Sequence, residues 1–133
     1  QLRSYNKHTE GANRLVITVF ARVVEPMEPE EMPENSVLLT GFVCKPVIYR
    51  TTPFLREIGD MLLAVNRAYN KSDYLPCIAW GRNALYARDL PVGGRVRVEG
   101  RLQSRCYQKC LPDGSSVERT AYEVSCSTVQ LLE

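Results

Sequence analysis

The chain has 133 residues, of which 44% are hydrophobic and 24% are charged, so the composition fits one globular domain and excludes a wholly disordered chain. No run approaches the roughly 18 apolar residues that a membrane-spanning helix needs. No leader of charged, then apolar, then small residues opens the sequence. We therefore expect a cytoplasmic protein.

Charge is distributed unevenly along the chain. The stretch 25–35 (EPMEPEEMPEN) contains five glutamates and three prolines but no basic residue. Without those five glutamates, 17 basic side chains face 10 acidic ones, so the remainder carries +7 against +2 for the whole chain. Proline and mutual repulsion keep such a stretch extended, which predicts a linker between residues 1–24 and 36–133. A basic body favours a polyanionic partner, although ordinary scatter of surface charge accounts for it equally well.

Residues 36–133 alternate between strand-like and turn-like patterns. Runs rich in apolar and β-branched residues predict strands at 37–43, 61–67, 74–80, 95–103 and 120–132. A short helix fits residues 83–90, with Asn83 as its N-cap, and a turn fits 70–73. Gly100 interrupts the fourth strand, as at a bulge or a sharp bend, and Asp113 with Gly114 marks a hairpin turn. Five strands with one helix between the third and fourth predict an all-β fold, the five-stranded OB-fold Greek-key barrel.

The N-terminal residues repeat the end of the chain. Residues 1–7 align with 101–109 after a slip of two residues, and 14–21 align with 119–126. The alignment predicts an N-terminal β-hairpin in residues 1–24, the last two strands of a truncated first OB copy. Chance similarity between two hairpins is the alternative. Because such a hairpin leaves strand edges and an apolar face uncovered, we expect it to dock on the 36–133 domain or on a neighbouring subunit.

Six short segments carry a family resemblance. They are NSVLLTG (35–41), YRTTP (49–53), LAVNR (63–67), DYLPCIAWG (73–81), GGRVRVEGRL (93–102) and YEV (122–124). In order and spacing they resemble the OB domain of the bacterial single-stranded DNA-binding proteins. A clostridial-type variant with two OB copies in one chain would also account for residues 1–24. The apolar spacing of residues 54–63 alone favours a helix, but the resemblance favours a turn that leads into a strand.

The resemblance implies four aromatic positions that stack on DNA bases. They are Tyr69, Tyr74, Trp80 and Tyr107. Cations near the same strand ends and loops are the candidates for phosphate contacts: Lys45, Arg50, Arg56, Arg67, Lys71, Arg82, Arg101, Arg105 and Lys109. Every base offers a π-face, so stacking and phosphate contacts together give binding that tolerates any sequence. Tyr49, Tyr86 and Tyr122 match none of the family's stacking positions, and we expect each to be half-buried by packing.

The resemblance further implies a function and partners. The function is sequence-tolerant binding of single-stranded DNA in replication, recombination or repair, without a cofactor, at the bacterial nucleoid. The expected assembly is a homo-oligomer, either a dimer or a tetramer. Replication and repair proteins are further partners in the family, but the acidic tip that recruits them has no counterpart before Glu133.

The sequence offers no catalytic or metal-binding constellation. Its five cysteines follow no CxxC pattern and lie far from the single His8, so we expect buried free thiols, no metal site and no enzyme. Two other functions remain open. One is a primosome-type assembly or interaction module with weak or no DNA binding, and the other is RNA binding. Buried aromatics at the four stacking positions would favour the interaction module, whereas exposure along a basic groove would favour strand binding.

Overall fold

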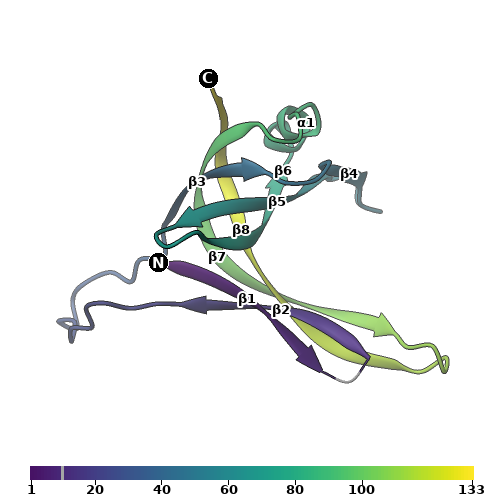
Figure 1. The fold of residues 1–133 in the computed structure, drawn as a ribbon, viewed down its shortest axis with the longest axis horizontal. Helices are drawn as coiled ribbons and strands as arrows, with labels where there is room; N and C mark the ends of the chain where they lie inside the picture. The colour runs from purple at the N-terminus through teal and green to yellow at the C-terminus, as the bar shows by residue number, and fades with distance from the viewer. Residues whose placement is uncertain (10) are drawn as a thin grey trace.

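Residues 36–133 form a β-barrel, and two hairpins extend from one end of it (Figure 1). The structure is a computed structural model that describes residues 1–9 and 11–133, without the side chain of Ala12. The elements are β1 (Leu2–Thr9), β2 (Ala12–Val19), β3 (Val37–Val43), β4 (Ile48–Thr51), β5 (Glu57–Arg67), β6 (Lys71–Trp80), α1 (Arg82–Arg88), β7 (Arg95–Cys110) and β8 (Ser116–Leu132). Among the described residues, no helix combines the length and apolar character needed to cross a membrane.

The barrel closes because β3 pairs on both of its edges. It runs antiparallel to β7 on one side and to β5 on the other. The strand order is β3-β7-β8-β6-β5, and β4 adds a short edge to β5. A parallel contact between β6 and β8, in which Cys77 lies opposite Val124, joins the two halves of the barrel. This is the predicted all-β OB-fold, with one short helix between its third and fourth strands.

The alternation of apolar residues places the core inside the barrel. Val96 and Val98 of β7 are fully buried, and Leu63, Leu75 and Val124 from three other strands are at most 1% exposed. The charged residues that alternate with these two valines, Arg95, Arg97 and Glu99, face solvent, as a period of two requires. The register of β7 against β8 shifts between Glu99 and Gly100, which confirms the predicted bulge.

The start of the helix differs from the prediction. Gly81, with φ of 56°, takes the N-cap position, and no side chain caps the helix. The prediction that Asn83 is the N-cap is therefore wrong. The positive φ of Gly81 turns the chain at the end of β6, so the helix begins at Arg82. Asn83 instead donates a hydrogen bond to the carbonyl oxygen of Ser127 at 3.0 Å.

The last two strands are longer than their hydrophobic pattern indicates. β7 continues from residue 103 to Cys110, and β8 begins at Ser116, so the pair leaves the barrel as a two-stranded arm. Most residues of β7 beyond 103 are exposed, so they have no apolar alternation to read, and cross-strand pairing maintains the arm. Its turn contains Asp113 and Gly114, as predicted.

Two turns flank β5, and only the first lies where the sequence predicts it. The chain turns at residues 53–54 and then enters β5, which confirms the turn-into-strand interpretation of residues 54–63. The turn that joins β5 to β6 comprises residues 68–70 rather than 70–73. Tyr69 and Asn70 both have a positive φ there, so the chain reverses earlier than the polar residues suggest.

The predicted N-terminal hairpin is confirmed and docks on its own barrel. β1 pairs with β2 in a register that places Leu2 opposite Val19. Leu2 and Ile17 are partly buried against the core cluster. Residues 20–36, all of which the structure describes, contain neither helix nor strand, in keeping with a linker.

The cysteines are less uniformly buried than expected. All five are free thiols; Cys77 and Cys126 are buried, but Cys106 and Cys110 are exposed on the arm. The prediction of buried cysteines is thus wrong for the arm, because residues beyond the barrel have no core to enter. A hydrogen bond with Cys126, together with burial, raises the pKa of the Cys77 thiol well above its ordinary value.

We expect the thiols to react in two classes. Since the thiolate is the nucleophile, Cys106 and Cys110 should react rapidly with an alkylating reagent near neutral pH. Cys77 and Cys126 should react only after unfolding. Peptide mass spectrometry after timed alkylation, with and without denaturant, measures both classes. Rapid labelling of Cys77 in the folded protein would contradict this expectation.

Candidate nucleic-acid interface

The outer face of the barrel carries the candidate site. Along β6, side chains alternate between the interior, which holds Leu75 and Cys77, and the exterior, which holds Tyr74, Pro76 and Trp80. The exterior residues continue onto β7 and β8 across the parallel contact between β6 and β8. The strand pairing therefore joins these elements into one curved surface.

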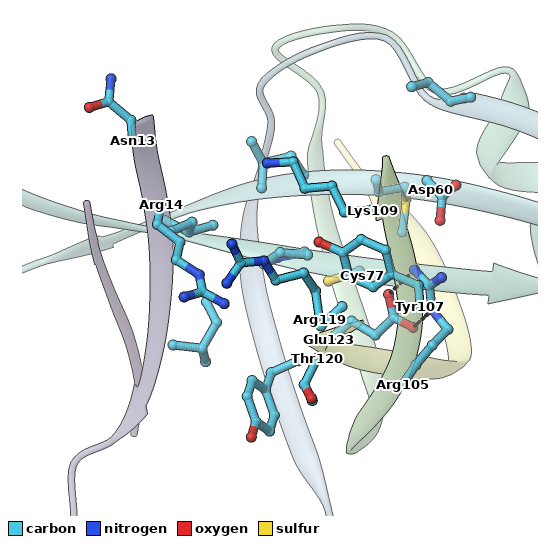
Figure 2. Close-up of a pocket in the computed structure, with 18 of the residues that line it drawn as sticks. Asn13, Arg14, Asp60, Cys77, Arg105, Tyr107, Lys109, Arg119, Thr120 and Glu123 are labelled. Atoms are coloured by element: carbon cyan, nitrogen blue, oxygen red, sulfur yellow. Dashed lines mark hydrogen bonds and ion pairs between the residues drawn. The ribbon is translucent and has the colours of Figure 1, made fainter. Parts of the chain in front are cut away.

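A groove of about 610 Å³ crosses this surface. Figure 2 shows Asn13 and Arg14 of β2 on one side of the groove and Tyr107 and Lys109 of β7 on the other. Residues of β5 and β6, including Pro76, line it between these two sides. The groove is thus formed by the N-terminal hairpin, the β7–β8 arm and the barrel together.

Six cations line the groove. Three were predicted from the sequence as phosphate contacts: Lys45, Arg105 and Lys109. The other three were not predicted: Lys7, Arg14 and Arg119. One signal could have identified Arg119, because the hairpin register around the predicted turn places it opposite Tyr107. The residues of β1 and β2 offered no such signal, since nothing local indicates that the hairpin folds back on the barrel.

Among the described residues, two acidic side chains line the groove, and both are paired. Glu123, which is 5% exposed, accepts a hydrogen bond from Arg105 Nε at 3.0 Å. This hydrogen bond raises the pKa of the Arg105 guanidinium above its ordinary value. Asp60 forms an ion pair with Arg50 at 3.1 Å. Counted over residues 1–9 and 11–133, the lining carries a formal excess of four positive charges, from six cations and two carboxylates.

The four predicted stacking aromatics occupy different places. Tyr107 is 42% exposed and lines the groove. Tyr74, which is 41% exposed, lies outside the groove on the outer face of β6. Tyr69 is almost fully exposed at the turn between β5 and β6, where its φ is 65°. Trp80 is half-buried, donates a hydrogen bond from Nε1 to Ser125 Oγ at 3.2 Å, and has the Arg56 guanidinium 5.0 Å from its ring centre.

The predicted cations outside the groove fall into two groups. Arg50 and Arg67 are bound to carboxylates, since Arg67 Nε lies 2.7 Å from Asp73 Oδ2. Four others are exposed and are distributed over the barrel: Arg56, Lys71, Arg82 and Arg101. The structure thus gathers only three of the nine predicted cations around Tyr107.

The three tyrosines that match no stacking position of the family differ from one another. Tyr49 is half-buried, as predicted, and packs against the core with Arg88 5.0 Å from its ring centre. Tyr86 is 44% exposed, so the prediction of half-buried packing is wrong for it, and its hydroxyl accepts a hydrogen bond from the Leu131 N–H. Tyr122 is 52% exposed and lines the groove, so the prediction of simple packing is wrong for it.

Exposure of the aromatics favours strand binding over an interaction module. Three of the four stacking candidates are at least 41% exposed, so their rings are open to a ligand. Over residues 1–9 and 11–133, no three histidine, cysteine, aspartate or glutamate side chains gather as a metal site would require. A basic groove with an exposed ring suits a polyanion with flat, stackable groups.

Comparison with known proteins gives a consistent result. Residues 34–132 match the single-strand binding protein family. "Single-stranded DNA-binding protein 1" of Staphylococcus aureus (strain COL) is 37% identical over 106 residues, which cover 74% of this chain and 61% of that protein. The "Single-stranded DNA-binding protein" of Bacillus cereus is 36% identical, with 74% and 60% covered. The chain thus spans about three fifths of the length of these relatives.

A solved structure resembles the whole described fold. It is a deletion mutant of the single-stranded DNA binding protein from Thermus aquaticus, matched with a TM-score of 0.81 at 22% identity. The match covers 100% of this chain and 58% of that one. At this identity the likeness concerns the fold.

Proposed function

The chain belongs to the single-strand binding protein family, and from this membership we propose that it binds single-stranded DNA through the groove on the outer face of its barrel. The observation that carries the proposal is Tyr107, an exposed ring in a groove with an excess of positive charge. Bases stack on the ring, and the backbone phosphates lie against Lys45, Arg105 and Lys109. Because neither contact depends on base identity, the protein accepts any sequence.

The remaining predicted aromatics extend the path of the strand beyond the groove. Trp80 stacks with Arg56 above its ring, so a base that reaches Trp80 either displaces the guanidinium or stacks on it. Tyr74 and Tyr69 follow toward the turn between β5 and β6. Further phosphate contacts come from three exposed cations, Lys71, Arg82 and Arg101.

The role that fits such binding is protection of the bare strand during replication, recombination or repair, in the cytoplasm at the bacterial nucleoid. Binding is the whole activity, without catalysis and without a cofactor. The protein acts as a homo-oligomer, a dimer or a tetramer, and replication and repair proteins are its partners. Light scattering of the free protein and of its DNA complex tests the oligomeric state.

Residues 1–24 fit the closing hairpin of another OB copy. Leu2 pairs with Val19 in the first hairpin, just as Leu102 pairs with Val124 in the last one. Counting outward from these pairs, Lys7 and Arg14 correspond to Tyr107 and Arg119 without the slip that the sequence alignment used. We interpret the first hairpin as a repeat of the last, with residues 25–35 as the linker between the two units.

Titration with oligo-dT tests the proposed function. Trp80 is the only tryptophan, so its fluorescence should be quenched when bases stack nearby. Affinity should fall with salt, and a duplex of the same length should bind much more weakly because its bases already stack on each other. No binding at low salt would reject DNA binding and favour an assembly module. Equal affinity for oligo-U would instead make the protein a general single-strand binder that includes RNA.

We expect Tyr107→Ala to weaken oligo-dT binding by about 1–3 kcal/mol, which is the known contribution of one base–aromatic stack in this class of protein. Tyr86→Ala is the matched control, because Tyr86 is 44% exposed against 42% for Tyr107 but lies on α1, at the other end of the barrel (Figure 1). Fluorescence titration measures both variants. Equal affinities for the two variants would contradict stacking at Tyr107.

A further inference from the structure

The N-terminal hairpin is held rigidly against the barrel. The backbone N–H of Ser4 donates to Asp73 Oδ1 at 2.9 Å, and Ser4 Oγ accepts the backbone N–H of Tyr74 at 2.6 Å. The second oxygen of Asp73 accepts from Arg67 Nε at 2.7 Å. Ser4 is 7% exposed and Asp73 is 1% exposed, so water competes little for these hydrogen bonds. Together with the packed Leu2, this contact fixes the base of the hairpin.

The fixed hairpin presents charge to the groove. Lys7 of β1 and Arg14 of β2 lie opposite each other in the hairpin register, and both line the groove. Figure 2 shows Arg119 and Lys109 extending from the arm toward the strand that carries Arg14. Within the described part of the chain, none of these four side chains forms an ion pair. Positive charges that face each other without counter-ions favour an anion between them.

A surface role for these charges would leave them on the solvent side of the hairpin. Arg22 is such a residue, exposed after the end of β2 and absent from the groove. Lys7 and Arg14 differ because they belong to the wall of a groove that also contains an exposed tyrosine. Lys7 and Arg14 therefore lie where they can contact the phosphates of a DNA strand whose bases stack at Tyr107.

We propose that the β1–β2 hairpin is the second wall of the DNA site, where Lys7 and Arg14 bind backbone phosphates of the strand stacked on Tyr107. The inference rests on the proposed function. In this arrangement the DNA strand passes between two hairpins rather than over an open sheet. Full affinity therefore requires the N-terminal hairpin as well as the barrel. Asn13 at the rim of the hairpin can donate a further hydrogen bond to the strand from its amide.

The test compares two variants of the full chain that lose the same charge. Lys7→Ala/Arg14→Ala removes both hairpin cations of the groove, and Arg22→Ala/Arg97→Ala removes two exposed cations outside it. Oligo-dT affinity is measured from about 0.1 to 1 M salt. The slope of log K against log salt is negative, and each lost phosphate contact reduces its magnitude by about 0.7, so two contacts amount to a roughly 25-fold loss at 0.1 M relative to 1 M.

For the groove variant we expect the magnitude of the negative slope to fall by about 1.4 and the affinity at 0.1 M salt to fall roughly 10- to 25-fold, with a much smaller change for the control. If the wild-type protein binds and the two variants weaken alike, the second wall is rejected while the proposed function stands. If the wild-type protein does not bind oligo-dT, both are rejected. Circular dichroism of each variant establishes that the fold is retained.

Discussion

Gly100→Ala is expected to lower the free energy of unfolding by about 3 kcal/mol. A Cβ at this position would clash with the carbonyl oxygen of Ser125, and would lie 2.9 Å from its carbonyl carbon and 3.1 Å from Cys126 Cα. These are backbone atoms of β8, which pairs with β7 and β6 in the barrel, and they can move only if the strand moves. The bulge at Gly100 brings the two backbones this close, so the requirement for glycine comes from space.

Gly59→Ala is the matched control for this prediction. Gly59 also lies in a barrel strand and is buried, but a Cβ there would meet its nearest atom, Ala84 Cα, at 3.4 Å, which is ordinary van der Waals contact. We expect this control to stay within about 1 kcal/mol of the wild type. Urea denaturation measures both variants. A Gly100→Ala midpoint equal to that of Gly59→Ala would show that the bulge can open without cost.

Asp73→Ala is expected to cost about 2–4 kcal/mol and to release the N-terminal hairpin. The substitution leaves the buried N–H of Ser4 without its acceptor and the guanidinium of Arg67 without its carboxylate. Because this contact holds the hairpin on the barrel, protease should cleave residues 1–24 of the variant before it cleaves the barrel. Oligo-dT affinity should fall as well, since Lys7 and Arg14 would no longer be held in place.

Asp60→Ala separates this effect from the loss of a carboxylate in general. Asp60 also lies on a barrel strand and pairs with an arginine, but its side chain is 34% exposed and that of Arg50 is 45% exposed. An ion pair so open to solvent contributes about 0–1 kcal/mol. Denaturation and timed proteolysis of both variants provide the comparison. A hairpin that resists protease equally in both variants would place its anchor elsewhere.

The barrel could be predicted because its determinants are local. The alternation that buries Val96 and Val98, the interruption at Gly100 and the turn at Asp113 each act within a few residues. The family resemblance then set the order of the strands. It also settled residues 54–63 in favour of a strand, where apolar spacing alone favoured a helix.

The groove could be predicted only in part because its walls meet through long-range contacts. Ser4 and Asp73 are 69 residues apart, and neither has a neighbour that marks it as an anchor. Without that contact, Lys7 and Arg14 read as ordinary charges on an exposed hairpin. The sequence also gives no sign that Arg50 and Arg67, which we predict as phosphate contacts, each form an ion pair with a carboxylate of another part of the sheet.

The parallel contact between Cys77 and Val124 also decides when the barrel can form. On a chain that emerges from the ribosome N-terminus first, β3, β5 and β6 appear well before β8. Until β8 arrives, β6 keeps one open edge, and Leu75 has no Val124 to pack against. The barrel cannot close without this strand, so the nascent domain completes its fold only after β8 has been synthesised. During that interval, the open edge of β6 can pair with a strand of a neighbouring chain. Rapid synthesis of β8 therefore limits mispairing of β6.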